Sequence, residues 1–195
     1  MAHINHANES ETNDVSLQFP GDRFPVVVGP NLRSSGWRGG LFVQYVTGDY
    51  DFTVEVSDGN ATAGFLLFAS ENYDLSIQGG AFLGGDGVGS AANFISGQPA
   101  THVGGQNVVT MVSGGTRSMF KVYETVALNG AGNRAGGAIT YTLGESLKIS
   151  ENGLLCNDSN VNLAAAGVAT PIVVGIVSAV PSSANNNRLG VDLKY

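Results

Sequence analysis

The sequence predicts an all-β protein: an antiparallel β-sandwich or jelly-roll-like domain followed by a small C-terminal β-barrel, with an extended N-terminal arm. Three observations support this class. Short apolar runs rich in Val, Phe, Tyr and Thr recur along the chain, and these residues favour strands. Clusters rich in Gly, Asn and Asp separate the runs, as turns do. Helical periodicity is nearly absent, and residues 162–167 are the best helix candidate.

Residues 1–20 are predicted to form the N-terminal arm. The segment is mostly polar, rich in Asn, Glu and His, and shows neither a strand nor a helix pattern. Such a segment buries too little apolar surface to offset the entropy that it loses on ordering. We therefore expect the arm either to lack order or to become fixed on a neighbouring subunit, with His3, Ile4 and His6 as its contacts.

Residues 21–126 are predicted to form the sandwich-like domain. Its first half contains four strand-like runs, at residues 24–29, 41–47, 51–57 and 64–69. The third run alternates apolar and polar residues, which is the pattern of a half-buried strand. The short Gly48-Asp49 connection predicts that the second and third runs form a hairpin. Two later runs, at residues 107–113 and 118–126, flank a turn at residues 114–117.

Residues 78–106 are predicted to be a long Gly-rich loop that packs on a neighbouring subunit. A loop of this length inside a compact domain usually has a function of its own. Apolar pairs interrupt the small and polar residues of this stretch, and such pairs favour burial. The residues that we expect to contact a partner here are Phe82, Leu83, Phe94 and Ile95.

Residues 127–137 are predicted to be a linker, and residues 138–195 a small β-barrel-like domain. The C-terminal segment combines short apolar runs with turn signals at Leu143-Gly144 and at residues 151–153. The expected strands lie around residues 138–142, 146–150, 153–156, 171–180 and 189–195. Closely spaced short strands suggest a barrel or a sandwich. This unit could fold alone or against the first domain.

The composition favours a surface that lies against other proteins. The net charge is −7, only 13% of the residues are charged, and the chain has 28 glycines. Its nine basic residues are scattered, whereas binding of nucleic acid through phosphates requires clustered ones. No apolar run approaches the length of a membrane-spanning helix. We expect neither nucleic acid nor membrane as a partner, and assembly in a host cytoplasm, since the first residues do not resemble a secretory signal.

No pattern in the chain predicts catalysis, a cofactor or a metal site, and we expect a protein that is not an enzyme. His3 and His6 lack a third ligand at a fixed spacing, and His102 has no nucleophile motif to pair with. Residues 84–89 lack the Lys and the helix of a phosphate-binding loop. Acidic residues within 49–58 do not follow the spacing of a calcium loop. The single Cys156 excludes an intrachain disulfide and is expected to be a buried thiol.

The C-terminal unit carries a family resemblance. Residues 138–195 contain GESLKISENGLL, an Ala/Gly connector, PIVVGIV and a Pro-Ser loop, in this order. This arrangement resembles the small β-barrel of tailed-phage capsid decoration (cement) proteins, and the stretches at 64–71 and 119–126 look like phage head structural proteins. The resemblance implies a homotrimer on the capsid exterior of the virion, which binds major capsid protein subunits and stabilises their contacts.

The large first domain leaves a second interpretation open, a head-fibre or receptor- or glycan-binding module. That interpretation predicts exposed aromatic residues, such as Trp37, Tyr50 and Tyr73, on one face of the oligomer. Trp37 lies in the glycine-flanked SSGWRGG, where a large ring has little local cover. We expect it either to contact a partner or to cap the core.

Overall fold

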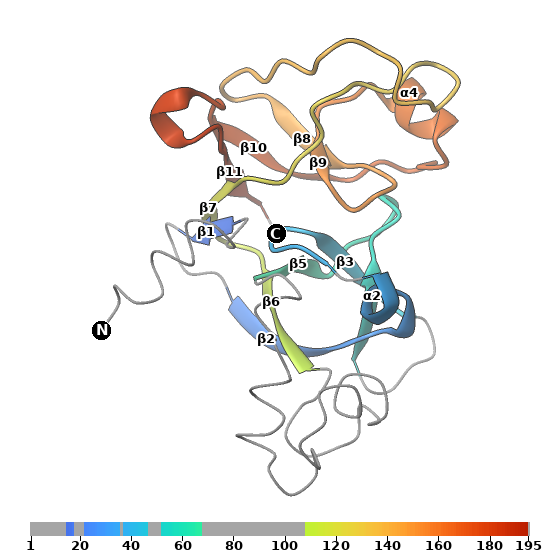
Figure 1. Ribbon diagram of the computed structural model, residues 1–195, viewed down its shortest axis with the longest axis vertical. Coiled ribbons are helices and arrows are strands. Elements are labelled where there is room, and N and C mark those ends of the chain that lie inside the picture. The colour runs from blue at the N-terminus through green and yellow to red at the C-terminus, as the bar shows by residue number, and fades with distance from the viewer. Residues whose placement is uncertain (1–14, 18–21, 36, 47–51, 68–107, 195) are drawn as a thin grey trace, which may run out of the picture.

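The structure is a computed structural model, and it describes residues 15–17, 22–35, 37–46, 52–67 and 108–194. Within these ranges strands dominate and form two sheets (Figure 1). The helical elements of this part of the chain are short: α2 (Pro30–Ser35), α4 (Asn160–Ala165) and the 3-10 helix η3 (Ser183–Asn185). The predicted all-β class is confirmed, and α4 overlaps the helix candidate at residues 162–167.

The first sheet is a closed five-stranded barrel with the strand order β2-β4-β3-β5-β6. Its strands are β2 (Asp22–Val28), β3 (Phe42–Tyr45), β4 (Thr53–Val56), β5 (Gly64–Leu66) and β6 (Val108–Ser113). The predicted hairpin is confirmed, because β3 and β4 pair antiparallel with Val43 opposite Val56. The parallel pair of β2 with β4, which places Val27 opposite Thr53, closes the barrel.

Glu55 of β4 fixes the helix that follows β2. Its Oε1 accepts a hydrogen bond from the Asn31 N–H at 2.9 Å, and its Oε2 accepts one from the Leu32 N–H at 3.0 Å. These bonds satisfy amide groups that have no partner inside the first turn of α2. A Cβ at Gly29 would collide with the Glu55 carboxylate, so a glycine precedes Pro30 here. α2 was not predicted, because PNLRSS lacks the run of alanines that marked the helix candidate at residues 162–167.

The second sheet has six strands in the order β1-β7-β11-β10-β8-β9, and all neighbours are antiparallel. Its strands are β1 (Val15–Leu17), β7 (Arg117–Phe120), β8 (Ser146–Ile149), β9 (Leu155–Cys156), β10 (Val173–Ala179) and β11 (Leu189–Leu193). Strands predicted at residues 146–150, 153–156, 171–180 and 189–195 are therefore present, whereas the strand predicted at residues 138–142 is absent and only Ala138 forms an isolated bridge, with Val126. In the long strand, Gly175 is required where β10 meets β11 closely, since a Cβ there would lie 2.5 Å from the Asp192 carbonyl oxygen.

The position of the barrel differs from the prediction. We expected a barrel within residues 138–195, but the closed barrel is formed by strands β2 to β6, and the C-terminal strands belong to the six-stranded sheet. One edge of β11 pairs with β10 of the C-terminal segment. The other edge pairs with β7, which places Val191 opposite Ser118, so the C-terminal strands do not close on themselves. Gly114 and Gly115, with φ of 43° and 61°, turn the chain from β6 of the barrel into β7 of the second sheet.

The outermost strand of the second sheet lies within the range predicted as an arm. Val15–Leu17 form β1, which pairs with β7 and places Val15 opposite Phe120. The Val15 side chain is 2% exposed and belongs to the core. Three residues are too few to show a period of two, so β1 is specified by the open edge of β7 rather than by a local pattern.

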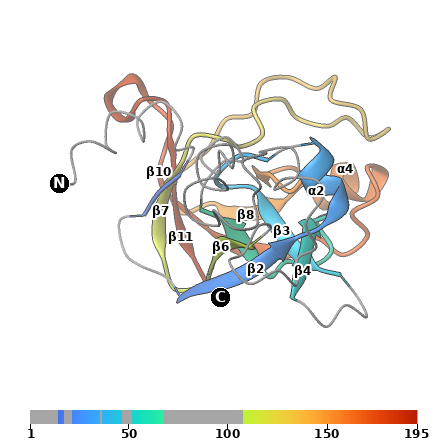
Figure 2. The ribbon, with the colours of Figure 1, turned by 60° about the horizontal axis from the view of Figure 1, so that its bottom comes forward.

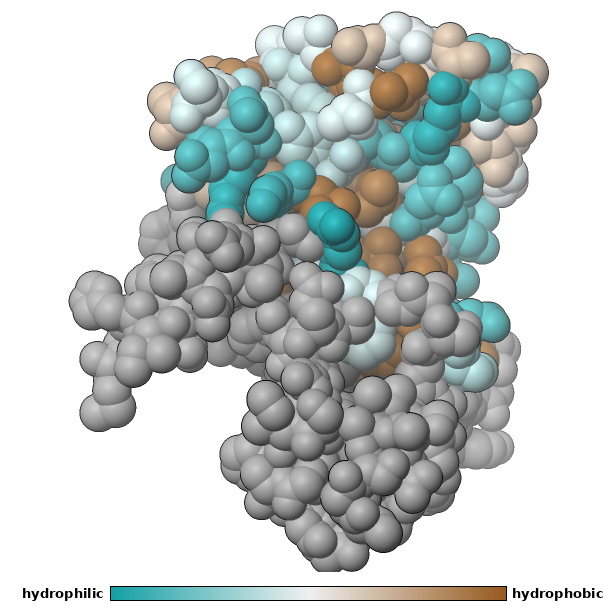
Figure 3. All heavy atoms as spheres, in the orientation of Figure 1, coloured by the Kyte–Doolittle hydropathy of each residue, from teal (hydrophilic) through white to brown (hydrophobic). Residues whose placement is uncertain are grey.

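The two sheets meet in a shared hydrophobic core, and the barrel also has a core of its own. Phe42 of β3 and Phe65 of β5 meet Phe120 of β7, with ring centroids 5.9 Å and 5.0 Å from that of Phe120. Gly40 lets the Phe120 ring approach, because a Cβ there would lie 2.9 Å from the ring. Figure 2 shows β7 and β11 running side by side next to the barrel strands. On the face drawn in Figure 3, apolar residues reach the surface near the junction of the two sheets. Of the two arrangements left open above, the structure has the C-terminal unit packed against the first.

Candidate functional site

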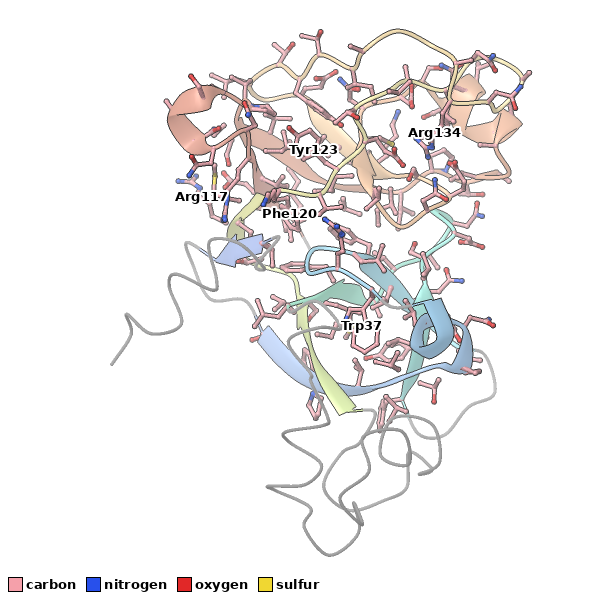
Figure 4. All side chains as sticks on the ribbon, viewed as in Figure 1. Trp37, Arg117, Phe120, Tyr123 and Arg134 are labelled. Carbon is pink, nitrogen blue, oxygen red and sulfur yellow. The ribbon has the colours of Figure 1, made fainter. Side chains whose placement is uncertain are left out.

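Trp37 is the one predicted contact residue that lies within the described ranges. Its side chain is half-buried and packs against the barrel core around Val26, Leu32 and Leu66, and Figure 4 shows it in the barrel half of the molecule. This is the arrangement of the core-capping alternative. The other predicted contacts, His3, Ile4, His6, Phe82, Leu83, Phe94 and Ile95, lie outside the described residues.

Three exposed apolar residues lie at one end of the β3–β4 hairpin, and we call them the Tyr45 patch: Tyr45, Val46 and Phe52. Their side chains are 48%, 37% and 66% exposed. The rings of Tyr45 and Phe52 meet edge to face with centroids 6.3 Å apart. The backbone holds them together, because the Val46 N–H donates to the Thr53 carbonyl oxygen at 2.9 Å and continues the β3–β4 pairing.

Phe52 is held in an unfavourable backbone conformation. Its φ is 54°, in the left-handed region that bulky residues rarely adopt. Such a conformation costs about 1–3 kcal/mol and persists where the surrounding structure imposes it. Here the Phe52 carbonyl oxygen accepts from the Val27 N–H at 3.2 Å, which ties the residue to β2. The barrel therefore presents a large ring to solvent at a backbone position where Gly would be less strained.

A second cluster is ionic and lies on the C-terminal side of the molecule. The guanidinium of Arg134 forms ion pairs with Glu124, through Nη1, and with Glu151, through Nη2 at 2.7 Å. The Ser150 hydroxyl donates to Glu124 Oε1 at 2.6 Å. Glu124 is 6% exposed, so its carboxylate is one of the few charged groups that the described residues bury. The cluster joins the irregular segment 121–138 to the turn between β8 and β9, and Figure 4 shows where Arg134 lies.

Burial changes the pKa of the Glu124 carboxyl group in this cluster. Loss of solvation raises the pKa of Glu124 above its usual range, while the Ser150 hydrogen bond and the charge of Arg134 offset this only in part. A raised pKa means that the folded protein holds the Glu124 proton more tightly than the unfolded chain does. Protonation of Glu124 therefore stabilises the folded protein. This stabilisation is complete below the pKa of about 4.3 that Glu has in an unfolded chain, and it is lost as the pH rises through the pKa of Glu124 in the folded protein.

Glu124→Gln is therefore expected to change the pH dependence of stability. As the pH falls from neutrality toward the ordinary Glu range, the free energy of unfolding of the wild type should rise relative to that of Glu124→Gln. Urea unfolding across a pH series measures this difference. Asp192→Asn provides a control of opposite sign, because Arg117 lowers the pKa of Asp192 and the Asp192 contribution is lost as the pH falls. Parallel curves for wild type and Glu124→Gln would contradict the expectation.

The acidic and amide side chains of the turns hold the backbone. Asp58 Oδ1 accepts from the Asn60 N–H at 2.9 Å and so holds the turn that follows β4. Asp158 is buried, and its Oδ2 accepts from the Leu128 N–H at 3.2 Å. Ser159 caps α4 by accepting from the Asn162 N–H at 3.1 Å. Among the described residues, no group of three His, Cys, Asp or Glu side chains could hold a metal ion.

A surface ion pair links β7 to β11. Arg117 and Asp192 pair through two hydrogen bonds, at 2.5 Å and 2.7 Å, beside a shallow open groove that Gly115, Thr116 and Leu193 also line.

Cys156 is fully buried, as predicted, and burial raises the pKa of its thiol to about 12. A thiol in this state is a poor nucleophile. Within the described ranges, no helix has the length and apolar character needed to cross a membrane.

Sequence reasoning missed both the Tyr45 patch and the ionic cluster. The patch had a weak signal, because Phe52 directly follows the turn residues GDYD, where an apolar residue has little local cover. The cluster had none, since Glu124, Arg134 and Glu151 come from three segments that only the fold brings together. Comparisons with known protein families, with curated proteins and with solved structures found no match to this chain.

Proposed function

We propose that this chain is a non-enzymatic structural protein of a virion, which binds the outer surface of a tailed-phage capsid as an oligomer and stabilises contacts between major capsid protein subunits. The Tyr45 patch is the observation that carries the proposal. Tyr and Phe are enriched in the buried centres of protein interfaces, where a few aromatic side chains supply most of the binding energy. The family resemblance of residues 138–195 supplies the identity of the partner.

The chemistry of the surface supports protein binding. Only 13% of the residues are charged, so few strongly hydrated groups must lose water when a partner covers the surface. Tyr45 and Phe52 are already partly covered, so each would bury only part of the about 150–250 Å² that a whole aromatic side chain can bury. A stable interface needs about 800 Å² per partner, so the patch would form the centre of a larger surface. The predicted contacts in the arm and in the 78–106 loop would add to it.

A binding assay with capsid shells tests this function. Purified protein is mixed with expanded shells that lack decoration protein, and both the bound protein and the melting temperature of the shells are measured. We expect saturable binding and a raised melting temperature. Absence of binding to shells, together with binding to host cells or to surface polysaccharide, would favour the head-fibre or receptor-binding alternative.

A matched pair of variants tests the surface itself. The double substitution Tyr45→Ser and Phe52→Ser should weaken shell binding at least about tenfold, which corresponds to about 1.4 kcal/mol. Val161→Ser is the control, because Val161 is 72% exposed but lies on α4, away from the β3–β4 hairpin (Figure 1). Equal binding by the two variants would show that another surface meets the capsid. Light scattering of the free protein checks the proposed homotrimer, whose mass would be three times the 20.1 kDa of one chain.

A further inference from the structure

The chain contains two Asn-Gly pairs, Asn129-Gly130 and Asn152-Gly153. The two pairs differ in the hydrogen bonds and packing of their glycine residues. An asparagine followed by glycine can lose its side-chain amide without an enzyme. The backbone nitrogen of the glycine attacks the asparagine Cγ, and the absence of a glycine side chain permits the close approach. Whether this reaction occurs depends on whether the glycine nitrogen is free and whether the backbone can move toward the side chain.

Asn129-Gly130 lies in an exposed turn. Apart from its two neighbours in the chain, no described residue has an atom within 4 Å of the position that a Gly130 Cβ would occupy. Within the described part of the chain, the Gly130 N–H donates no hydrogen bond. No hydrogen bond within the described residues therefore occupies this nitrogen, and the turn keeps its shape through the Gly132 N–H, which donates to the Asn129 carbonyl oxygen at 2.8 Å.

The side-chain carbonyl oxygen of Asn129 is hydrogen-bonded to the backbone that follows it. This Oδ1 accepts hydrogen bonds from the Ala131 N–H at 2.9 Å and from the Asn133 N–H at 3.1 Å. These bonds keep the amide folded back over the backbone that follows it. Two N–H donors on the carbonyl oxygen also stabilise the negative charge that this oxygen acquires when a nucleophile adds to the carbon.

Asn152-Gly153 is held at both ends. The Gly153 N–H donates to the Ser150 carbonyl oxygen at 3.0 Å, and the Gly153 carbonyl oxygen accepts from the Phe42 N–H at 2.8 Å. Gly153 is buried against β3, where a Cβ would lie 2.6 Å from the Phe42 carbonyl oxygen. The Asn152 Nδ2 donates to Glu151 Oε1 at 3.2 Å. Attack by the Gly153 nitrogen would require this turn to leave the shared core.

We propose that Asn129 is a site of spontaneous deamidation and that the fold protects Asn152 from the same reaction. The Gly130 nitrogen forms a bond to Cγ of Asn129 and gives up its proton. The bond from Cγ to Nδ2 breaks, and ammonia leaves with that proton, which closes a five-membered succinimide ring. Solvent water then opens either carbonyl of the ring, and the product is aspartate or isoaspartate. No oxidant, reductant or enzyme takes part.

The products differ in their effect on the loop. Aspartate adds one negative charge and keeps an oxygen that can accept from the Ala131 and Asn133 N–H groups. Isoaspartate adds a carbon to the main chain, so that the two hydrogen bonds at residue 129 are lost. The neighbouring backbone stays anchored, because the Leu128 carbonyl oxygen accepts from Asn162 Nδ2 at 2.9 Å. The modification therefore changes the charge and shape of an exposed loop while leaving the core in place.

Peptide mass spectrometry of the full chain after storage in mildly alkaline buffer tests the proposal. Fragment ions locate the mass gain of an amide-to-acid conversion at Asn129, Asn133 or Asn152. We expect conversion at Asn129 to be at least about tenfold faster than at Asn152, which corresponds to about 1.4 kcal/mol in the barrier. In concentrated urea the two rates should converge, because both pairs then lie in an unfolded chain. Equal rates in the folded protein would overturn the proposal.

Gly130→Ala is the matched variant. Apart from its two neighbours in the chain, the added methyl group meets no atom of a described residue within 4 Å, so the unfolding midpoint should stay the same, while the methyl group hinders attack and slows conversion at Asn129. The rate at Asn152 serves as the internal reference in the same sample. An unchanged Asn129 rate in this variant, or an Asn129 that converts in urea but not in the folded protein, would also refute the proposal.

Discussion

Phe120→Ala is expected to lower the free energy of unfolding by about 3–5 kcal/mol, the usual cost of deleting a fully buried phenylalanine ring. Phe120 is 0% exposed, and its ring lies between the sheets in contact with Phe42 and Phe65. The cavity would open where the barrel and the second sheet meet, so both sheets would lose packing. A loss of this size is a large part of the 5–15 kcal/mol that is typical of a folded domain.

Urea unfolding followed by circular dichroism measures the effect of Phe120→Ala. Phe52→Ala serves as the control, because the same number of atoms is removed from a ring that is 66% exposed. A surface change of this kind should alter stability by less than about 1 kcal/mol. If both substitutions cost the same, the aromatic contact between the sheets does not contribute to stability in the way that its burial predicts.

A fragment of residues 127–195 is expected not to fold cooperatively, although composition marks residue 127 as a natural boundary. The fragment lacks β7, so the backbone groups of β11 that pair with Arg117–Phe120 would lose their partners. It also lacks the barrel side chains that cover the shared core, Phe42 and Phe65 among them. A chain of about 70 residues rarely has a core large enough to tolerate such losses.

The fragment is tested by its unfolding curve and its amide NMR spectrum, compared with those of the full chain. We expect a broad, non-cooperative transition and poorly dispersed amide signals. Addition of the complementary fragment 1–126 should restore a cooperative transition, because it supplies β7 and the barrel. A sigmoidal transition of the isolated fragment would show that the C-terminal strands form an independent domain after all.

Much of the local structure could be read from the residues. The apolar runs at 146–150 and 171–180 became β8 and β10, and the runs on either side of Gly48-Asp49 became the hairpin of β3 and β4. These predictions succeeded because alternation, β-branched residues and glycine turns act over a few neighbouring positions. β1 was missed because three residues are too few to show a period of two, and α2 because it lacks the alanines that marked the helix candidate at residues 162–167.

The residues of the candidate site could be predicted from the sequence less well than the strands could. Trp37 was singled out for its glycine-rich surroundings, and the structure packs it against the barrel core. Tyr45 and Phe52 drew no attention, because exposure depends on whether another segment covers a side chain. The contacts between Arg134 and its two glutamates likewise depend on segments that are distant in the sequence.

The sequence by itself determined that the chain folds into strands, where most of them lie, and that Cys156 is buried. Only the tertiary structure decided which edges meet: the parallel pair that closes the barrel between β2 and β4, and the transfer of β7 to the sheet of β11. The physical reason is that side chains specify which face of a strand is buried, whereas the backbone groups along its edges are nearly the same in every strand. The choice among edges is made by long-range packing, here by the three rings of Phe42, Phe65 and Phe120.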